Sequence, residues 1–386
     1  MRKAVKMVSA IILIFMLCIN TGCSLFPDGN INNEVEDNDG TVSITENESK
    51  HIAGTLVGNV AIDADVKIPE NVQWKQYKLI GRQISKEQAD EHAKLFASGR
   101  DYSEPEFSDY DNIKRYNYKY NDGSHFTDGE DCILYNTDES MKMRYYWFAG
   151  YKRSKKMWSN KDEAFPQKSL SGCDLNETIA QVKELCKGLG IEISTEEPDV
   201  YVMDAESMNK MVKKYNIERG VDANDEHALK EWTTENEVYY LIFEMALNGT
   251  TMESASVETD SKRSHPHWVT AAVGRDGIKE FEAERVYGTE TKQELEGALC
   301  SVDEAVKVVA AQLQYLTGSN EYSISDIELK YMGLANSDWS EYYARPYWIF
   351  SAVSKKVYIK DGVKTEEFNE QKLCVDAVKK TFYIGK

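Results

Sequence analysis

Positive charge is scarce in this chain relative to negative charge. Its 386 residues include 46 lysines and arginines against 65 aspartates and glutamates, which gives a formal net charge of -19 at pH 7. Proteins that bind nucleic acid need an excess of cations to replace the counterions of the phosphates. The composition therefore argues against a nucleic-acid partner and indicates an acidic, well-solvated surface.

Long apolar runs are also missing. The apolar stretch Val8–Ile19 is shorter than the ~20 residues that a membrane-spanning helix needs. Arg2, Lys3 and Lys6 precede it, and small residues end it. A basic head, a short apolar core and a small-residue exit are the parts of a secretory signal. Because the signal carries three cations and no acid, its removal changes the net charge from -19 to -22.

The end of this signal carries a recognisable motif. Thr21-Gly22-Cys23 resembles the lipobox of bacterial lipoproteins, although Asn20 stands where that family has leucine or valine. The resemblance implies a signal peptide over 1–22, a diacylglycerol on Cys23 and attachment to the outer face of the cell membrane. An ordinary signal peptide and an uncleaved anchor are the alternatives.

Paired cysteines are not evident either. Five cysteines remain beyond the anchor, an odd number at wide spacings, so the sequence predicts mostly free thiols rather than a disulfide framework. They are Cys132, Cys173, Cys186, Cys300 and Cys374.

Familiar catalytic motifs are absent from the sequence. It has no Gly-x-Ser-x-Gly, His-Glu-x-x-His, Cys-x-x-Cys or phosphate-cradling loop. Cys132 follows an aspartate, as in some wall-cleaving peptidases, but the next residues favour a strand, where a thiol is not activated by a helix. His265 and His267 could share a metal with a third ligand, or lie at a polar hairpin edge. We predict no catalytic residue, metal or cofactor.

Helix and strand patterns recur along the chain. Residues 23–50 are rich in Asn, Asp, Glu and Gly, which predicts a disordered tether. Helix starts are predicted at Ser85, Asp174 and Ser301, each followed by strand patterns. We expect an α+β fold of three tandem helix-on-antiparallel-sheet units. Their ranges are 51–165, 166–296 with a helical insertion over 200–235, and 297–386.

The third unit carries a second resemblance. A helix opening at Ser301-Val302-Asp303-Glu304-Ala305 is followed by strand patterns at 327–331, 345–350 and 375–377. This arrangement resembles the PepSY-type, cystatin-like helix-plus-sheet units of exported Gram-positive proteins, and the whole chain is similar to uncharacterised Firmicutes lipoproteins. The resemblance implies binding, inhibition or regulation, and it supplies no catalytic residues.

The densest aromatic patch lies in this third unit. Pro346 cannot donate a ladder hydrogen bond, so the patch should begin a strand or lie at a sheet edge. An exposed edge could accept a peptide as an added strand. The alternative is that the rings cover the helix of the unit. The candidate binding edge consists of Tyr342, Tyr343, Arg345, Tyr347 and Trp348.

These observations lead to three functional hypotheses. The first is a lipid-anchored, extracytoplasmic binding or regulatory protein that is held to the membrane through Cys23 and contacts a membrane protein or a peptide. The second is a hydrolase of cell-wall polymer or peptide. The third is a structural lipoprotein that supports a membrane complex. A pocket with converging titratable groups would favour the hydrolase.

Overall fold

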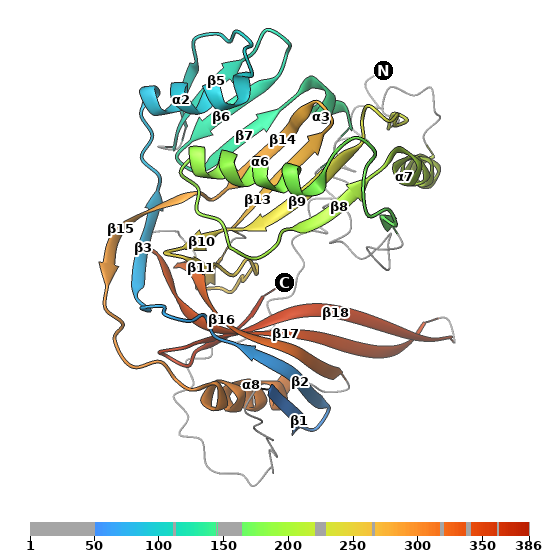
Figure 1. The fold of residues 1–386 in the computed structure, drawn as a ribbon. Coiled ribbons are helices and arrows are strands. Elements are labelled where there is room, and N and C mark those ends of the chain that lie inside the picture. Colours follow the sequence, from blue (N-terminus) through green and yellow to red (C-terminus); the bar gives the residue numbers. More distant parts are fainter. Residues whose placement is uncertain are drawn as a thin grey trace, which may run out of the picture.

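The chain forms two β-sheets with helices on their faces. The computed structural model describes residues 51–110, 113–143, 145, 164–220, 229–264, 267–316, 320–336, 341–360 and 363–385. Figure 1 shows an eight-stranded sheet above a nine-stranded sheet, with strands β3 and β15 running between them. The α+β class expected from the sequence is confirmed. No helix within the described ranges is long and apolar enough to cross a membrane.

The eight-stranded sheet has the order β4-β5-β6-β7-β14-β13-β9-β8. Its first half follows helix α2 in sequence and its second half follows helix α6, and the two halves join where β7 pairs antiparallel with β14. The order is therefore symmetric about the central pair. The bounds are α2 Lys86–Ala97, β4 Glu106–Tyr110, β5 Ile113–Lys119, β6 His125–Gly129, β7 Cys132–Asn136, α3 Asp138–Met143, α6 Leu175–Gly188, β8 Asp199–Met203, β9 Val238–Glu244, β13 Trp268–Gly274 and β14 Gly277–Glu284.

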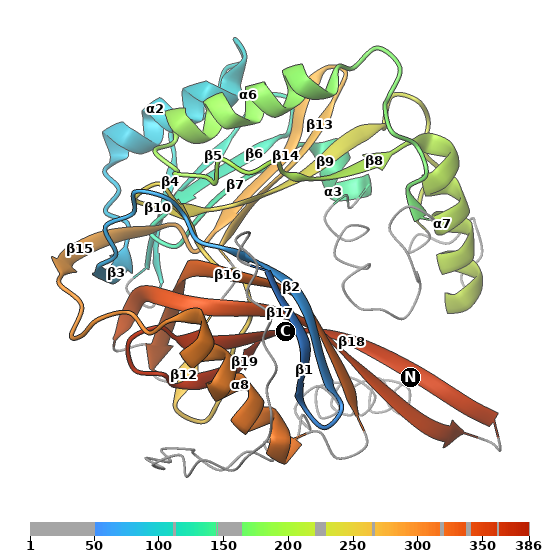
Figure 2. The same cartoon turned by 60° about the horizontal axis from the view of Figure 1, so that its bottom comes forward.

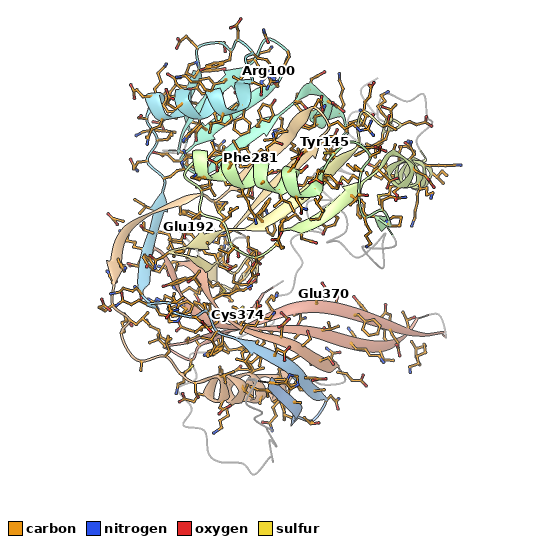
Figure 3. All side chains as sticks on the ribbon, viewed as in Figure 1. Arg100, Tyr145, Glu192, Phe281, Glu370 and Cys374 are labelled. Carbon is orange, nitrogen blue, oxygen red and sulfur yellow. The ribbon has the colours of Figure 1, made fainter. Side chains whose placement is uncertain are left out.

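Helices α2 and α6 begin where the sequence predicts. Ser85 accepts a hydrogen bond from the Gln88 amide, and the Gln88 side chain accepts one from the Ser85 amide, which forms a capping box. Asp174 caps α6 through the Glu177 amide. Both helices cover one face of the eight-stranded sheet (Figure 2), where Phe281 of β14 (labelled in Figure 3) is fully buried with Phe96.

The predicted helical insertion is helix α7, Ala205–Arg219, between β8 and β9. Asp204 caps its start, and Gly220 ends it in the left-handed conformation with a φ of 62°. Met208, Met211 and Val212 are buried against Tyr201 and Tyr240 of the sheet. This second core lies on the face opposite α2 and α6.

The nine-stranded sheet has the main order β1-β2-β16-β17-β18-β19, with β3, β12 and β15 joined beside it. Helix α8 packs on one face, and its start is a capping box between Ser301 and Glu304, as predicted. The bounds are β1 His51–Val57, β2 Val60–Lys67, β3 Gln76–Gly81, β10 Ala246–Leu247, β11 Thr250–Thr251, β12 Lys262–Arg263, β15 Tyr287–Gln293, α8 Val302–Leu316, β16 Glu321–Asn336, β17 Tyr342–Lys360, β18 Val363–Asp376 and β19 Phe382–Gly385.

The strand pairing corrects the predicted unit boundaries. The range 51–165 does not form a sheet of its own, because β2 pairs in parallel with β16 and β1 pairs with β2. The ranges 51–165 and 166–296 instead share the eight-stranded sheet through β7 and β14. Alternation of apolar and polar residues predicts that a stretch is a strand, but it does not identify the partner strand.

The packing of α8 corrects one further expectation. Val306, Val309 and Leu313 are fully buried, but they face Ile327, Leu329, Trp348 and Phe350. The alternation along the strands predicts that Leu329, Tyr331, Tyr347 and Ile349 lie beneath the helix. Only Leu329 does: Tyr347 and Ile349 lie on the other face of β17 in a separate cluster, and Tyr331 lies in another. The cross-strand partners explain this, since Leu329 is opposite Trp348 and successive side chains of a strand alternate between faces. The indole of Trp348 donates to the carbonyl of Cys300 at 3.1 Å.

Candidate functional site

The predicted aromatic binding edge is not an edge. Strand β17 pairs with β16 along one side, and with β3 and then β18 along the other. Tyr342, Tyr347 and Trp348 are 5%, 2% and 3% exposed, so their rings belong to the core. Arg345 lies 3.8 Å from Asp376 and over the ring of Tyr343.

The edge predicted from Pro346 is wrong because of where the neighbouring strands end. The ladder between β17 and β3 ends at Ala344, and the ladder with β18 begins at Tyr347. Pro346 sits at this change of partner, and its carbonyl accepts from the amide of Ala377 at 3.0 Å. A missing amide hydrogen therefore removes no ladder bond there, and the strand stays inside the sheet.

Two further sequence candidates, His267 and Cys132, have structural roles. The side chain of His267 is 1% exposed and its Nε2 lies 2.6 Å from the hydroxyl of Tyr342. His265 and the lipidation site Cys23 lie outside the described residues. Cys132 is buried in β7, and burial raises the pKa of its thiol to about 12, which leaves it unreactive at neutral pH. Across the described ranges, no three His, Cys, Asp or Glu side chains could hold a metal ion together.

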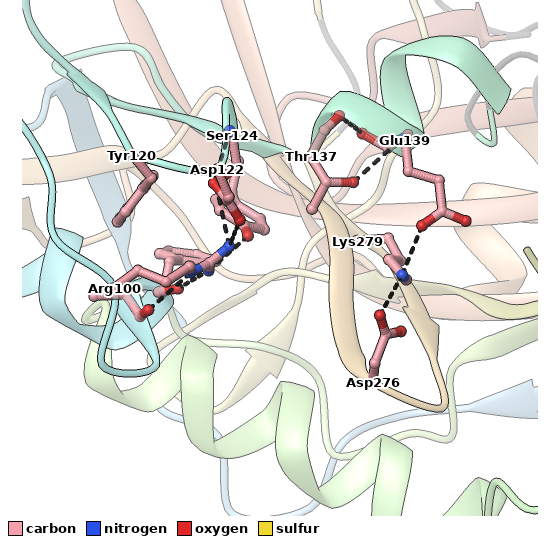
Figure 4. Close-up of polar contacts among 12 residues, drawn as sticks. Arg100, Tyr120, Asp122, Ser124, Thr137, Glu139, Asp276 and Lys279 are labelled. Carbon is pink, nitrogen blue, oxygen red and sulfur yellow. Dashed lines mark hydrogen bonds and ion pairs between the residues drawn. The ribbon is translucent and has the colours of Figure 1, made fainter. Parts of the chain in front are cut away.

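Two buried polar clusters are explained by architecture (Figure 4). Arg100 donates to the carbonyls of Phe96 and Ala97 at the end of α2, and to Ser124 and Tyr135. It therefore satisfies carbonyls that the helix leaves unpaired. Lys279 is 6% exposed and donates to Glu139 at 2.7 Å and Asp276 at 2.6 Å. Both cations are paired, since Arg100 also contacts Asp122 and Lys279 contacts two carboxylates, of which Asp276 is 69% exposed.

A third cluster joins the two sheets. Lys330 of β16 is 7% exposed, and its ammonium lies 3.3 Å from Glu244 of β9 and 2.7 Å from Glu328. Burial raises the pKa of Glu244, against the attraction of Lys330. Burial would also raise the pKa of Glu328, but Lys330 and Lys67 lower it overall. Because the partners come from both sheets, this network fixes how the sheets are placed.

A histidine–aspartate pair joins helix α2 to strand β6. The Asp128 carboxylate is fully buried, with Oδ2 2.7 Å from His92 Nδ1 and Oδ1 2.8 Å from Arg82 Nη1. His92 also lines a shallow hollow of about 370 Å³ between α2 and α6, beside Glu87 and Glu91. A carboxylate can orient a histidine as a general base in this way. The residues that line this hollow supply no Ser, Thr, Cys or Tyr as a nucleophile.

The other hollow lies on the open face of the nine-stranded sheet. It is a groove of about 400 Å³, and we call it the sheet groove. Cross-strand pairing places Thr55, Ala61, Ser323 and Val353 in one row across β1, β2, β16 and β17, so they share a face. Helix α8 covers the opposite face. The groove is lined by Thr55, Gly58, Asn59, Val60, Ala61, Glu321, Tyr322, Ser323, Val353, Lys355 and Phe368.

The sheet groove has the chemistry of a binding surface. Phe368 is 50% exposed, and the ammonium of Lys355 lies 5.9 Å from the centre of its ring. Lys355 is also 3.2 Å from Glu366 and 3.8 Å from Glu321. Small polar side chains, one exposed ring and a lysine between carboxylates suit an extended chain that lies along the sheet. No histidine or cysteine lines the groove to activate the hydroxyls of Thr55 or Ser323.

Comparison with known proteins defines the fold alone. No protein-family model and no curated protein sequence matches the chain. The structure is similar to that of an uncharacterised protein from Eubacterium rectale, known from a crystal structure at 1.45 Å resolution. The TM-score is 0.61 at 14% identity, and the match covers 86% of this chain and 93% of that one. The two-sheet architecture therefore recurs in a second protein with little sequence in common.

Proposed function

We propose that the chain is a lipid-anchored binding or regulatory protein at the outer face of the cell membrane, and that it binds through the sheet groove. The observation that carries this proposal is the groove itself, an accessible sheet face with an exposed ring and no activating base. The lipobox-like sequence at Cys23 supports the location. An extended peptide or a segment of a membrane protein fits the groove in shape and chemistry.

The order of the elements supports the PepSY-like, cystatin-like interpretation. Each of α2, α6 and α8 is followed by four strands that lie next to one another in the sheet in sequence order, apart from short strands in the loop before β13. The second unit is enlarged by α7, as the sequence indicates. We propose that the three units are variants of one helix-plus-sheet module, of which the third forms the sheet groove together with β1 and β2.

Site-specific crosslinking in the native host tests the binding role. A photoreactive residue at Ser323, inside the groove, should form a discrete adduct with one partner. The same residue at Lys187 on α6, whose side chain is 77% exposed, is the matched control. Lys355→Glu should abolish the adduct from Ser323, because it reverses the charge beside Phe368. Equal adducts from both positions would contradict a specific groove.

The hydrolase is the second candidate, and the His92–Asp128 dyad is the observation that favours it. Purified protein would then release soluble fragments from wall polymer or peptide, and His92→Ala would abolish the release. Helix α2, which carries His92, covers the eight-stranded sheet, whereas Ser323 is on the nine-stranded sheet. The two assays therefore report on separate surfaces. Activity that depends on His92, without an adduct at Ser323, would replace the binding role with catalysis.

A further inference from the structure

Most strand edges of the two sheets are protected from pairing with another chain. Strand β8, at one end of the eight-stranded sheet, is buried from Tyr201 to Met203 and packs with helix α7. In the nine-stranded sheet, Gly385 of β19 is bridged to Val257, and the ladders of β1 and β15 each contain a register shift. Covered or irregular edges of this kind resist the addition of a further strand.

Strand β4, at the other end of the eight-stranded sheet, lacks these protections. Its ladder with β5 is regular from Glu106 to Tyr110, and in the described part of the chain it pairs with no other strand. Figure 2 shows β4 at the end of the sheet. Phe107 is 52% exposed, and the centre of its ring lies 5.3 Å from that of Tyr116. A regular edge that exposes a large apolar side chain is a surface to which another strand can add.

The hydrogen bonds of β5 show which backbone groups of β4 face outward. The amide of Ser103 donates to the carbonyl of Lys119, so Lys119 directs its backbone groups toward the side of β4. Because these groups alternate between the two sides of a strand, every second residue of β5 before Lys119 also bonds to β4, and one of them is opposite Ser108. Ser108 is therefore bonded to β5, whereas Phe107 and Asp109 direct their N–H and C=O groups away from the sheet.

This spacing of outward groups is self-complementary. In a second copy of β4 that lies antiparallel with Ser108 opposite Ser108, Phe107 of each copy is opposite Asp109 of the other. Every outward N–H and C=O of both strands is then paired. A register centred on Phe107 would place Asp109 opposite Pro105, which has no N–H. A register centred on Asp109 would place two carboxylates opposite each other, which is unfavourable.

The charges at the edge are compatible with the register centred on Ser108. Asp109 is opposite Lys114 in its own sheet, so a cation accompanies this carboxylate. Glu106 would be opposite Tyr110 of the second copy rather than opposite another acid. No two acids of β4 therefore face each other directly across the contact.

We propose that two copies of this chain pair through β4 and join their eight-stranded sheets into one continuous sheet. The same kind of contact exists inside the chain, where β7 and β14 join the two halves of the sheet as antiparallel strands. A contact between two short strands is small, so we expect a weak, reversible dimer. The β4 edge and the sheet groove are on different sheets, so the pairing requires neither the groove nor the lipid anchor.

Disulfide crosslinking of the full-length protein in intact cells tests the pairing. Opposite residues of an antiparallel pair without hydrogen bonds have Cα atoms about 4.5 Å apart, a distance that a disulfide can bridge. Under mild oxidation, Ser108→Cys should therefore form a dimer that a reductant dissociates. Glu106→Cys is the matched control on the same exposed strand, because its two copies would lie about 14 Å apart. Wild type gives the background from the native cysteines.

Phe107→Pro, combined with Ser108→Cys, provides the second measurement. The N–H of Phe107 is not used within the sheet, so a proline there leaves the ladder with β5 intact but removes a donor from each copy of the edge. Crosslinking should fall about tenfold or more, while the urea midpoint of unfolding stays close to that of Ser108→Cys alone. Asp109→Pro, whose N–H also points outward, should have the same effect.

Two results would overturn the proposal. If Ser108→Cys forms no more dimer than Glu106→Cys, or if folded Phe107→Pro and Asp109→Pro variants crosslink as well as Ser108→Cys alone, two copies do not pair through β4. If Ser108→Cys instead forms an adduct with a different protein, the edge binds another partner and the second copy is excluded. Both results leave the lipid anchor and the sheet groove to their own tests.

Discussion

Replacing Glu282 with glutamine should stabilise the protein at alkaline pH. Glu282 is on β14, opposite Thr270 and Leu134, on the face turned away from α2 and α6. Burial, together with the neighbouring carboxylate of Glu284, raises its pKa to about 7. The carboxyl therefore resists ionisation in the folded protein, and Glu282→Gln removes the charge without changing the shape of the side chain.

The magnitude follows from the two pKa values. A carboxyl that titrates at 4.5 when unfolded and at about 7 when folded contributes stability fully below pH 4.5, and this contribution is lost as pH rises through 7. The loss is about 3 kcal/mol at pH 8 and less than about 1 kcal/mol at pH 5. The free energy of unfolding of Glu282→Gln should therefore exceed that of wild type by about 3 kcal/mol at pH 8 and by less than about 1 kcal/mol at pH 5.

Urea unfolding at pH 5 and pH 8, followed by tryptophan fluorescence, measures the difference. Glu231→Gln, at an exposed loop position, is the control and should change the free energy of unfolding by less than about 0.5 kcal/mol at either pH. If Glu282→Gln is no more stable than wild type at pH 8, the carboxyl is not held in a charge-opposing site, and the described packing of this face is wrong.

Three further predictions test how the side chains are packed. Leu313→Ala should cost roughly 2–5 kcal/mol in unfolding free energy, because Leu313 is fully buried on the face of α8 that packs against the sheet. Lys307→Ala, at an exposed position of the same helix, should cost less than about 0.5 kcal/mol, and equal small effects would mean that α8 is not packed on the sheet. Gly333→Ala should cost about 1–3 kcal/mol, because a Cβ there would lie 2.5 Å from the Tyr342 hydroxyl and 2.9 Å from His267 Nε2. Gly297→Ala, whose Cβ would be 3.5 Å from Val378, should change much less, and a similar loss at both sites would contradict the close approach. Alkylation followed by mass spectrometry should label Cys132, Cys186 and Cys374 slowly in folded protein, since burial raises the pKa of all three thiols, and fully in denatured protein without reductant; a disulfide in the native protein would refute the prediction.

Local structure could be predicted from the sequence because its signals are local. The caps at Ser85, Asp174 and Ser301 were placed correctly, since each cap depends on residues within three positions of it. The strict alternation of apolar and polar residues over 60–68 predicts a strand, and the structure has β2 there. The insertion predicted over 200–235 contains α7. These elements required no knowledge of the fold.

Strand partners and exposure could not be predicted in the same way. The pairing of β2 with β16 joins residues about 260 positions apart, and no pattern in either strand specifies the other. Pro346 indicated an edge, but whether a proline breaks a ladder depends on where the neighbouring strands end. The sheet groove was missed because its lining comes from five strands, although exposed Phe368 between lysines and glutamates was a usable signal.

The location at the membrane is the premise of the proposed function, and detergent-phase partitioning measures it most directly. Cells that express wild type or Cys23→Ala are lysed in a detergent that separates on warming, and the two phases are assayed for the protein. We predict that wild type enters the detergent phase and that exported Cys23→Ala stays in the aqueous phase or remains an uncleaved precursor. If exported wild type and Cys23→Ala both enter the aqueous phase, the protein is not lipid-anchored.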